Sequence, residues 1–299
     1  MRAEAVGTSG EAVHRIEAAE TASQAVRRSL RCPLHHPLHH PLRHPLRHPL
    51  RHPLRHPPAL PATIGPMQVP IEWLPDEGAP QQLILLLHGW GSDGRAMAPL
   101  AQALRSAFPQ AAVLAPDAPH AFERGGTARQ WYGADDLTPA IWPQRVDRAL
   151  PALREWVLAQ QQRLGVAPAA TALGGFSQGA ILALALAVQE DGTAGRVLAF
   201  GGCFTAQPLA APRLTTVHLF HGDDDRVIPA DGSRQALTWL GELQGDATVD
   251  IAQGIGHELH PVLIDCALQR LQAHIPLRTW QAALGAAAAL APNAPTEDD

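Results

Sequence analysis

The stretch G-G-F-S-Q-G at residues 174–179 constrains the fold more than any other part of the chain. Residues 175–179 fit the pattern G-x-S-x-G, in which a serine occupies a sharp turn between a strand and a helix with its hydroxyl exposed. The preceding T-A-L is compatible with a buried strand, and the apolar run at 180–188 predicts a helix. We therefore predict strand, turn and helix, with Ser177 as candidate nucleophile. The alternative is a glycine-rich turn that holds an ordinary serine.

Two later segments supply the partners that a serine nucleophile needs. A serine hydroxyl reacts weakly at neutral pH, so it requires a base, and the base requires an orienting acid. On a scaffold of this kind the order along the chain is Ser, then Asp or Glu, then His. The segment V-H-L-F-H-G-D-D-D-R-V-I-P at 217–229 joins a predicted strand to an Asp-rich turn, and G-I-G-H at 254–257 presents His257 as the candidate base.

An early turn adds a fourth element. The run L-I-L-L-L at 83–87 is typical of a strand buried on both faces, and H-G-W-G follows it. In this kind of site one backbone N–H of the early turn and the N–H after the nucleophile form the oxyanion hole, which indicates Trp90 and Gln178. Gln178 also opens the predicted helix, whose positive end favours an anion. We expect His88 and His221, each beside a glycine at a strand end, to make structural hydrogen bonds.

The alternation of strands and helices predicts an α/β fold. This pattern is typical of a mostly parallel sheet with helices on both faces, and active residues should gather at the carboxyl ends of its strands. The predicted strands lie near 69–74, 82–88, 111–115, 169–175, 196–201, 215–221 and 247–252. The predicted helices lie near 94–107, 144–164, 178–190, 231–244 and 260–273.

Taken together, the four motifs resemble those of the phospholipase/carboxylesterase family, which includes acyl-protein thioesterases and small bacterial esterases. The resemblance covers roughly residues 67–275. It implies an α/β-hydrolase fold without a large cap domain, hydrolysis of carboxylic esters or thioesters, and no cofactor or metal. The family's catalytic Asp is the fifth residue of H-G-x-x-D. That position is Asp225 here, so the implied triad is Ser177, Asp225 and His257.

Aromatic residues near the motifs bear on substrate size. Trp90 stands where the family commonly has a smaller apolar residue, and R-Q-W-Y at 129–132 resembles the bacterial members. We expect Trp90, Trp131 and Tyr132 to crowd the substrate pocket and to favour esters of short to medium acyl chains. The alternative is that these aromatics pack in the core or cover the surface.

Two other functions compete with a short-chain esterase. One is a long-chain thioesterase or lysophospholipase, and the other is a hydrolase-like binding module without catalysis.

The two ends of the chain have a different composition. Residues 31–58 repeat P-L-H-H and then P-L-R-H, and eight of the 16 His lie there. Proline at every fourth position prevents helix and ladder pairing, so we expect disorder over 1–66, a hydrolase domain over 67–283, and a disordered Ala-rich, acidic end over 284–299. His-rich tracts can bind Zn²⁺ or Ni²⁺ loosely. The simpler interpretation is an expanded repeat without function, with the true start at Met67.

Charge and composition exclude several functions. Residues 1–66 contain nine Arg and four Glu, which is a net charge of +5. Because the whole chain has a net charge of −5, the remainder carries −10, which argues against a nucleic-acid partner. No apolar run is long enough for a membrane span, and the first 30 residues contain no apolar core of a secretion signal. Cys32, Cys203 and Cys266 show no metal or disulfide spacing, so the expected compartment is the cytoplasm. The expected partner is a small-molecule ester or thioester, and the alternatives of monomer and homodimer are both open.

Overall fold

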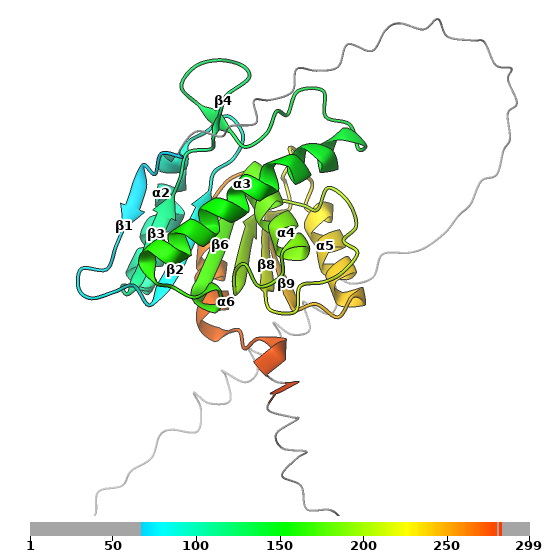
Figure 1. The fold of residues 1–299 in the computed structure, drawn as a ribbon. Coiled ribbons are helices and arrows are strands. Elements are labelled where there is room, and N and C mark those ends of the chain that lie inside the picture. The colour runs from blue at the N-terminus through cyan, green and yellow to red at the C-terminus, as the bar shows by residue number, and fades with distance from the viewer. Residues whose placement is uncertain (1–66, 280, 283–299) are drawn as a thin grey trace, which may run out of the picture. The chain divides into compact units, whose positions relative to one another are not determined.

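A seven-stranded sheet forms the centre of the fold (Figure 1). The computed structural model describes residues 67–279, 281 and 282, so the predicted tails lie outside the described residues. The strand order is β1-β3-β2-β6-β7-β8-β9; β1 is antiparallel to β3, and the other pairs in this sheet are parallel. The strands are β1 Ile71–Trp73, β2 Gln82–Leu87, β3 Ala111–Ala115, β6 Thr171–Phe176, β7 Arg196–Phe200, β8 Thr216–Gly222 and β9 Ala247–Ala252.

Helices cover both faces of this sheet, as the alternating pattern predicts. Buried side chains of α3, α4 and α5 belong to one apolar cluster, and those of α2 and α6 belong to the other. Figure 1 shows α3, α4 and α5 together on the viewer's side. The helices are α2 Ala98–Ala107, α3 Ile141–Leu164, α4 Gln178–Gln189, α5 Asp231–Glu242 and α6 Pro261–Ala273, with 3₁₀ turns η1 Gly94–Met97 and η2 Pro168–Ala170.

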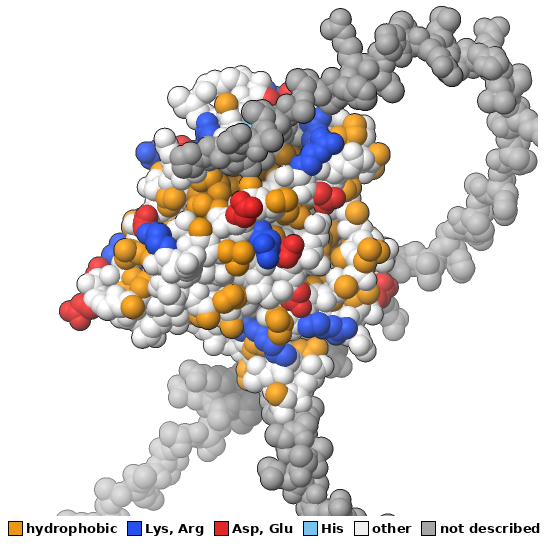
Figure 2. All heavy atoms as spheres, in the orientation of Figure 1, with side chains coloured by type: hydrophobic (Ala, Val, Ile, Leu, Met, Phe, Trp, Pro, Cys, Tyr) orange, Lys and Arg blue, Asp and Glu red, His pale blue; other side chains and the backbone are white. Residues whose placement is uncertain are grey.

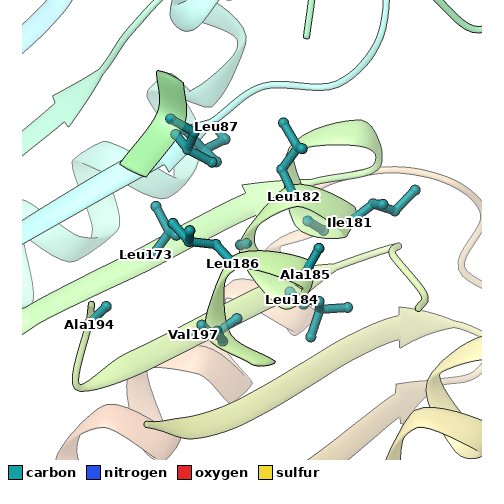
Figure 3. Packing of buried hydrophobic residues seen from close by; sticks show 14 of the residues in the cluster. Leu87, Leu173, Ile181, Leu182, Leu184, Ala185, Leu186, Ala194 and Val197 are labelled. Carbon is teal, nitrogen blue, oxygen red and sulfur yellow. The ribbon is translucent and has the colours of Figure 1, made fainter. Parts of the chain in front are cut away.

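The sequence of α4 explains why the turn at Ser177 has a fixed position. A surface helix has one apolar stripe, whereas α4 is apolar all round and is buried from Gln178 to Ala187. Its Ile181, Leu182 and Leu186 lie among side chains of neighbouring strands, Leu173 and Val197 among them (Figure 3). The start of α4, and with it residue 177, is therefore fixed by the core itself.

The seven predicted strands and five predicted helices are all present, with three differences in detail. The helix expected over 94–107 is a 3₁₀ turn followed by α2, because Pro99 lacks an N–H and is tolerated only in the first turn of an α-helix. Helix α3 begins at Ile141, three residues before the predicted start at 144. The short pair β4 His120–Ala121 and β5 Arg129–Gln130 was not predicted, because two residues give no readable alternation. The connection that carries this pair, residues 116–140, contains no further domain, in agreement with the absence of a large cap.

The surface of the described part is mixed in character. On the face shown in Figure 2, acidic, basic and apolar side chains are interspersed. Among the residues that the structure describes, no helix combines the length and the apolar character that crossing a bilayer requires.

A buried histidine on β8 gives the fold a dependence on pH. The side chain of His218 has no solvent exposure, its Nδ1 lies 2.8 Å from Thr248 Oγ1, and its Nε2 has no hydrogen-bond partner within the described residues. Burial, together with the nearby His274, lowers the pKa of His218 to about 3. The unfolded chain takes up this proton near pH ~6.5, whereas the folded protein does not, so the free energy of unfolding falls as the pH drops from there.

We expect His218→Leu to remove this part of the pH dependence. Between about pH 7.5 and 5, the free energy of unfolding should fall by about 2 kcal/mol less in the variant than in the wild type. At pH ~7.5 the variant should be at least as stable, because the unpaired Nε2 is gone. Urea unfolding of both proteins at the two pH values measures the difference, and equal losses would show that His218 is protonated in the folded state.

Candidate active site

The turn after β6 has the strained geometry of a nucleophile turn. Ser177 has φ 53° and ψ −116°, and positive φ is uncommon for a residue other than glycine. A Cβ at Gly179 would overlap the carbonyl group of Leu87, and a Cβ at Gly175 would lie 2.6 Å from the backbone N of Ala180. Both glycines of G-x-S-x-G are therefore required by close backbone approaches, and Ser177 is held at the junction of β6 and α4.

Three side chains predicted from separate motifs meet at this turn. His257 Nδ1–H donates to Asp225 Oδ2 over 2.6 Å, which leaves Nε2 as the acceptor. Ser177 Oγ–H donates to that Nε2 over 2.9 Å. The three residues come from the segments after β6, β8 and β9, whose parallel strands end at the same edge of the sheet. This continuous hydrogen-bond chain can transfer a proton from the hydroxyl to the imidazole.

The acid of this chain is buried and ionised. The side chain of Asp225 has no exposed surface, and its Oδ1 accepts hydrogen bonds from the N–H groups of Val227 at 2.8 Å and Ile228 at 2.9 Å. Burial alone would raise the pKa of Asp225, but the hydrogen bonds from His257 and from these two N–H groups hold the pKa below its usual range. Asp225 therefore carries the negative charge that an imidazolium beside it would need.

The two neighbouring carboxylates have other roles. Asp223 Oδ1 accepts a hydrogen bond of 2.6 Å from the N–H of Gly254, so it ties the turn after β8 to the loop that carries His257. Asp224 is exposed, and its backbone N–H donates to the carbonyl of Ile255 over 3.0 Å. Of the three adjacent acids, only Asp225 contacts His257.

Two backbone N–H groups close to Ser177 have no hydrogen-bond partner among the described residues. Gln178 is the first residue of α4, and helical hydrogen bonding leaves the N–H at that position unpaired. A Cβ on Gly89 would lie 3.4 Å from Ser177 Cβ, so the early turn passes next to the serine. Among the hydrogen bonds of the described residues, none uses the N–H of Trp90. Both predicted oxyanion donors are thus available near Ser177, one of them at the positive end of a helix.

The side chain of Trp90 is fixed by the connection between β3 and α3. Its Nε1–H lies 3.1 Å from Glu123 Oε1 and 3.1 Å from Gln130 Oε1, and the guanidinium of Arg124 lies 4.4 Å from the ring centroid. The ring of Phe122 packs edge-on against it at 4.9 Å. The indole next to the candidate oxyanion hole is therefore held by several contacts and has a cation above it.

The prediction that Trp131 and Tyr132 line the substrate pocket is wrong. Their side chains are 2% and 3% exposed and belong to the main apolar cluster. Hydrogen bonding explains their inward direction. The indole N–H of Trp131 donates to the carbonyl of His88 over 2.9 Å. The side-chain amide of Gln178 accepts from Trp131 N–H and donates to Tyr132 O, both over 2.8 Å. Trp131 and Tyr132 therefore pack in the core, which is the alternative considered in the sequence analysis.

His88 has the structural hydrogen bonds that were expected of it. Its Nε2 accepts from the N–H of Ala118 over 2.9 Å, and its Nδ1–H donates to the carbonyl of Gly89 over 2.7 Å. Burial lowers the pKa of His88, so the ring is neutral at neutral pH. These two bonds hold the turn that carries the Trp90 N–H.

Two residues that support the base were missed in the sequence. The ring of Phe176 lies 4.7 Å from that of His257, centroid to centroid. Gly201 has φ +55°, and a Cβ there would lie 3.3 Å from the His257 ring. The available signals were the position of Phe176 inside G-F-S-Q-G and the G-G pair after β7, but neither motif states which ring it will face.

Within the part of the chain that the structure describes, no group of three or more His, Cys, Asp or Glu side chains is arranged to hold a metal ion. The His-rich tract lies outside the described residues. A hollow of about 690 Å³ lies between β9 and α6, but its lining contains none of the residues of the hydrogen-bond chain.

The chain is similar to known esterases and thioesterases. The family model described as phospholipase/carboxylesterase matches residues 74–275. Esterase YpfH of Escherichia coli (strain K12) is 38% identical over 211 residues, which cover 70% of this chain and 90% of that protein. Acyl-protein thioesterase 1 of Saccharomyces cerevisiae is 29% identical over 164 residues, covering 50% of this chain and 72% of that protein. The crystal structure of esterase PE8 has a TM-score of 0.65 and 33% identity, covering 70% of this chain and 99% of that one.

Proposed function

Because the chain belongs to the phospholipase/carboxylesterase family of hydrolases, we propose that it cleaves carboxylic esters through an acyl-enzyme on Ser177, with His257 as base and Asp225 as its orienting acid. The observation that carries this proposal is the hydrogen-bond chain Ser177–His257–Asp225, which begins at a strained turn. A merely structural serine would not need the positive φ that directs its hydroxyl at the histidine.

The mechanism follows from the direction of these hydrogen bonds. Ser177 Oγ forms a bond to the acyl carbon while its proton moves to His257 Nε2. The carbonyl oxygen becomes negative and accepts hydrogen bonds from the N–H groups of Trp90 and Gln178. His257 then gives the proton to the leaving oxygen as the C–O bond breaks. In the second half of the reaction, water attacks the acyl carbon of the acyl-enzyme and gives a proton to His257. His257 then returns this proton to Ser177 Oγ as the acyl–oxygen bond breaks, which releases the carboxylic acid.

Asp225 has two tasks in this mechanism. Its hydrogen bond to Nδ1–H selects the tautomer in which Nε2 is free to accept the serine proton. Its charge, retained because its pKa is lowered, stabilises the imidazolium that forms in each half of the reaction. Neither step requires a metal, so turnover should be indifferent to EDTA.

The substrate class is inferred from the surroundings of Trp90. With Trp131 and Tyr132 in the core, the expectation of short acyl chains rests on the fixed indole of Trp90 and on the charged Arg124 above it. A rigid ring and a cation next to the oxyanion donor leave less apolar surface for a long chain. We therefore propose acetyl to hexanoyl esters as the preferred substrates.

A series of p-nitrophenyl esters, together with a palmitoyl thioester, tests this proposal. We expect kcat/KM to be higher for acetyl to hexanoyl esters than for palmitoyl compounds, with and without EDTA. A higher kcat/KM for the palmitoyl thioester would favour a function like that of Acyl-protein thioesterase 1. If the folded protein turned over no ester and did not react with a fluorophosphonate, a binding role without catalysis would replace the proposal.

A further inference from the structure

A second histidine contacts the acid of the hydrogen-bond chain. His221 lies on β8, is fully buried, and faces α5 rather than the substrate side. Its Nε2 lies 3.1 Å from Asp225 Oδ2 and 2.8 Å from the carbonyl oxygen of Ile228. Its Nδ1 lies 2.7 Å from Ser233 Oγ on α5. This ring takes no part in the proposed proton transfers.

The partners of His221 determine where its proton is. An ionised carboxylate and a carbonyl oxygen can only accept, so Nε2 must carry a hydrogen that the two oxygens share. Ser233 Oγ–H can donate to Nδ1 at 2.7 Å, which is nearer than its other acceptor, the carbonyl of Gly202 at 3.3 Å, so the neutral ring is fully satisfied. Burial lowers the pKa of His221, which agrees with a neutral ring. His221 is thus a neutral N–H donor held in one tautomer by Ser233 and Ile228.

The consequence concerns Oδ2 of Asp225. Oδ1 is fixed by two backbone N–H groups, whereas the donors to Oδ2 among the described residues are His257 and His221. The side chain of His257 is 15% exposed and lies on a loop, while His221 is buried on β8, a strand that is paired on both sides. Of the two donors to Oδ2, His221 is therefore the rigid one.

We propose that His221 is a positioning residue. It holds the Asp225 carboxylate in the plane that His257 requires, and its Nε2–H stabilises part of the negative charge on Oδ2. This inference rests on the proposed function. Because the ring is neutral, it orients the acid without cancelling the charge that stabilises the imidazolium; a Lys or Arg at the same place would cancel it. His221 acts only through Asp225 and does not touch the substrate.

Three variants of His221 test the proposal. His221→Leu removes the N–H donor and should lower kcat by about 10- to 100-fold with KM little changed, as expected for the loss of a hydrogen bond to a charged group. His221→Gln, whose longer amide can reach Oδ2, should recover most of kcat. His221→Asn, which is long enough for Ser233 but too short for Asp225, should resemble the Leu variant.

The pH–rate profile separates positioning from simple structural support. Without the shared N–H, more negative charge stays on Oδ2, which favours a positive charge on the neighbouring imidazole ring. The acid limb of kcat/KM should move to higher pH in the Leu and Asn variants and remain in place in the Gln variant. The matched control is His218→Leu, a buried histidine three positions earlier on β8 that has no contact with the triad; its acid limb should coincide with that of the wild type.

The proposal fails if a folded His221→Leu has wild-type kcat. It also fails if all three variants lose activity equally with an unmoved acid limb, because that result describes a support for the turn. If His221→Leu does not fold, the comparison of Asn with Gln decides. Fluorophosphonate labelling of the wild type keeps this test independent: absence of labelling would contradict the proposed function, whereas labelling with an unaffected His221→Leu would contradict only the role of His221.

Discussion

Replacing Ser177 with alanine is expected to lower kcat for ester hydrolysis by about 10³-fold or more, with the fold unchanged. Among the described residues, the Ser177 hydroxyl is the hydrogen-bond partner of His257 Nε2, so its loss removes both the proposed attacking atom and the proton that the proposed base would receive. The variant should also lose stoichiometric labelling by a fluorophosphonate. Activity and labelling are measured on the same preparation as the unfolding midpoint.

The matched control for this variant is Ser106→Ala. Ser106 lies on α2 with an exposed side chain, and α2 packs on the face of the sheet opposite to α4. Alanine at 177 must adopt the same positive φ as serine, so no large change in stability is expected from the backbone. Undiminished turnover by folded Ser177→Ala would exclude a serine nucleophile.

The candidate site was predictable because each sequence motif marks the carboxyl end of a strand. In a parallel sheet covered on both faces, each strand is a short apolar run that ends in a glycine turn, as at residues 83–91 and 171–179. The carboxyl ends of such strands lie at one edge, so residues that are 80 positions apart, Ser177 and His257, can be expected to meet before any coordinates are known.

The direction of side chains in irregular segments was not predictable. Residues 116–140 contain only two very short strands, so no periodicity indicates which way Trp131 and Tyr132 point. Their burial depends on partners elsewhere in the chain, the carbonyl of His88 and the side chain of Gln178, which hydropathy does not reveal. Trp90 is held in the same way by two side chains of that connection. The directions of these aromatic side chains therefore follow from the structure and not from the sequence pattern.

Among the three adjacent acids, Asp225→Asn is expected to have by far the largest effect, a loss of roughly 10³- to 10⁴-fold in kcat. Asp223→Asn should cost much less, because an Asn oxygen can still accept the N–H of Gly254 and keep the base loop in place. Asp224→Asn should be nearly neutral, since that side chain is exposed. Steady-state turnover of one short-chain ester by the three variants measures the order.

The structure also fixes how the new amide of Asp225→Asn must lie. The N–H groups of Val227 and Ile228 donate and therefore require an oxygen at the Oδ1 position, so the NH₂ group is forced to the Oδ2 position, 2.6 Å from His257 Nδ1 in the wild type. A donor there requires Nδ1 to accept, which puts the proton on Nε2 and leaves the base unable to take the proton of Ser177. The same NH₂ also faces the N–H of His221, so stability should fall as well. If Asp223→Asn proved the most damaging of the three, the acid would have been assigned two residues too far along the chain.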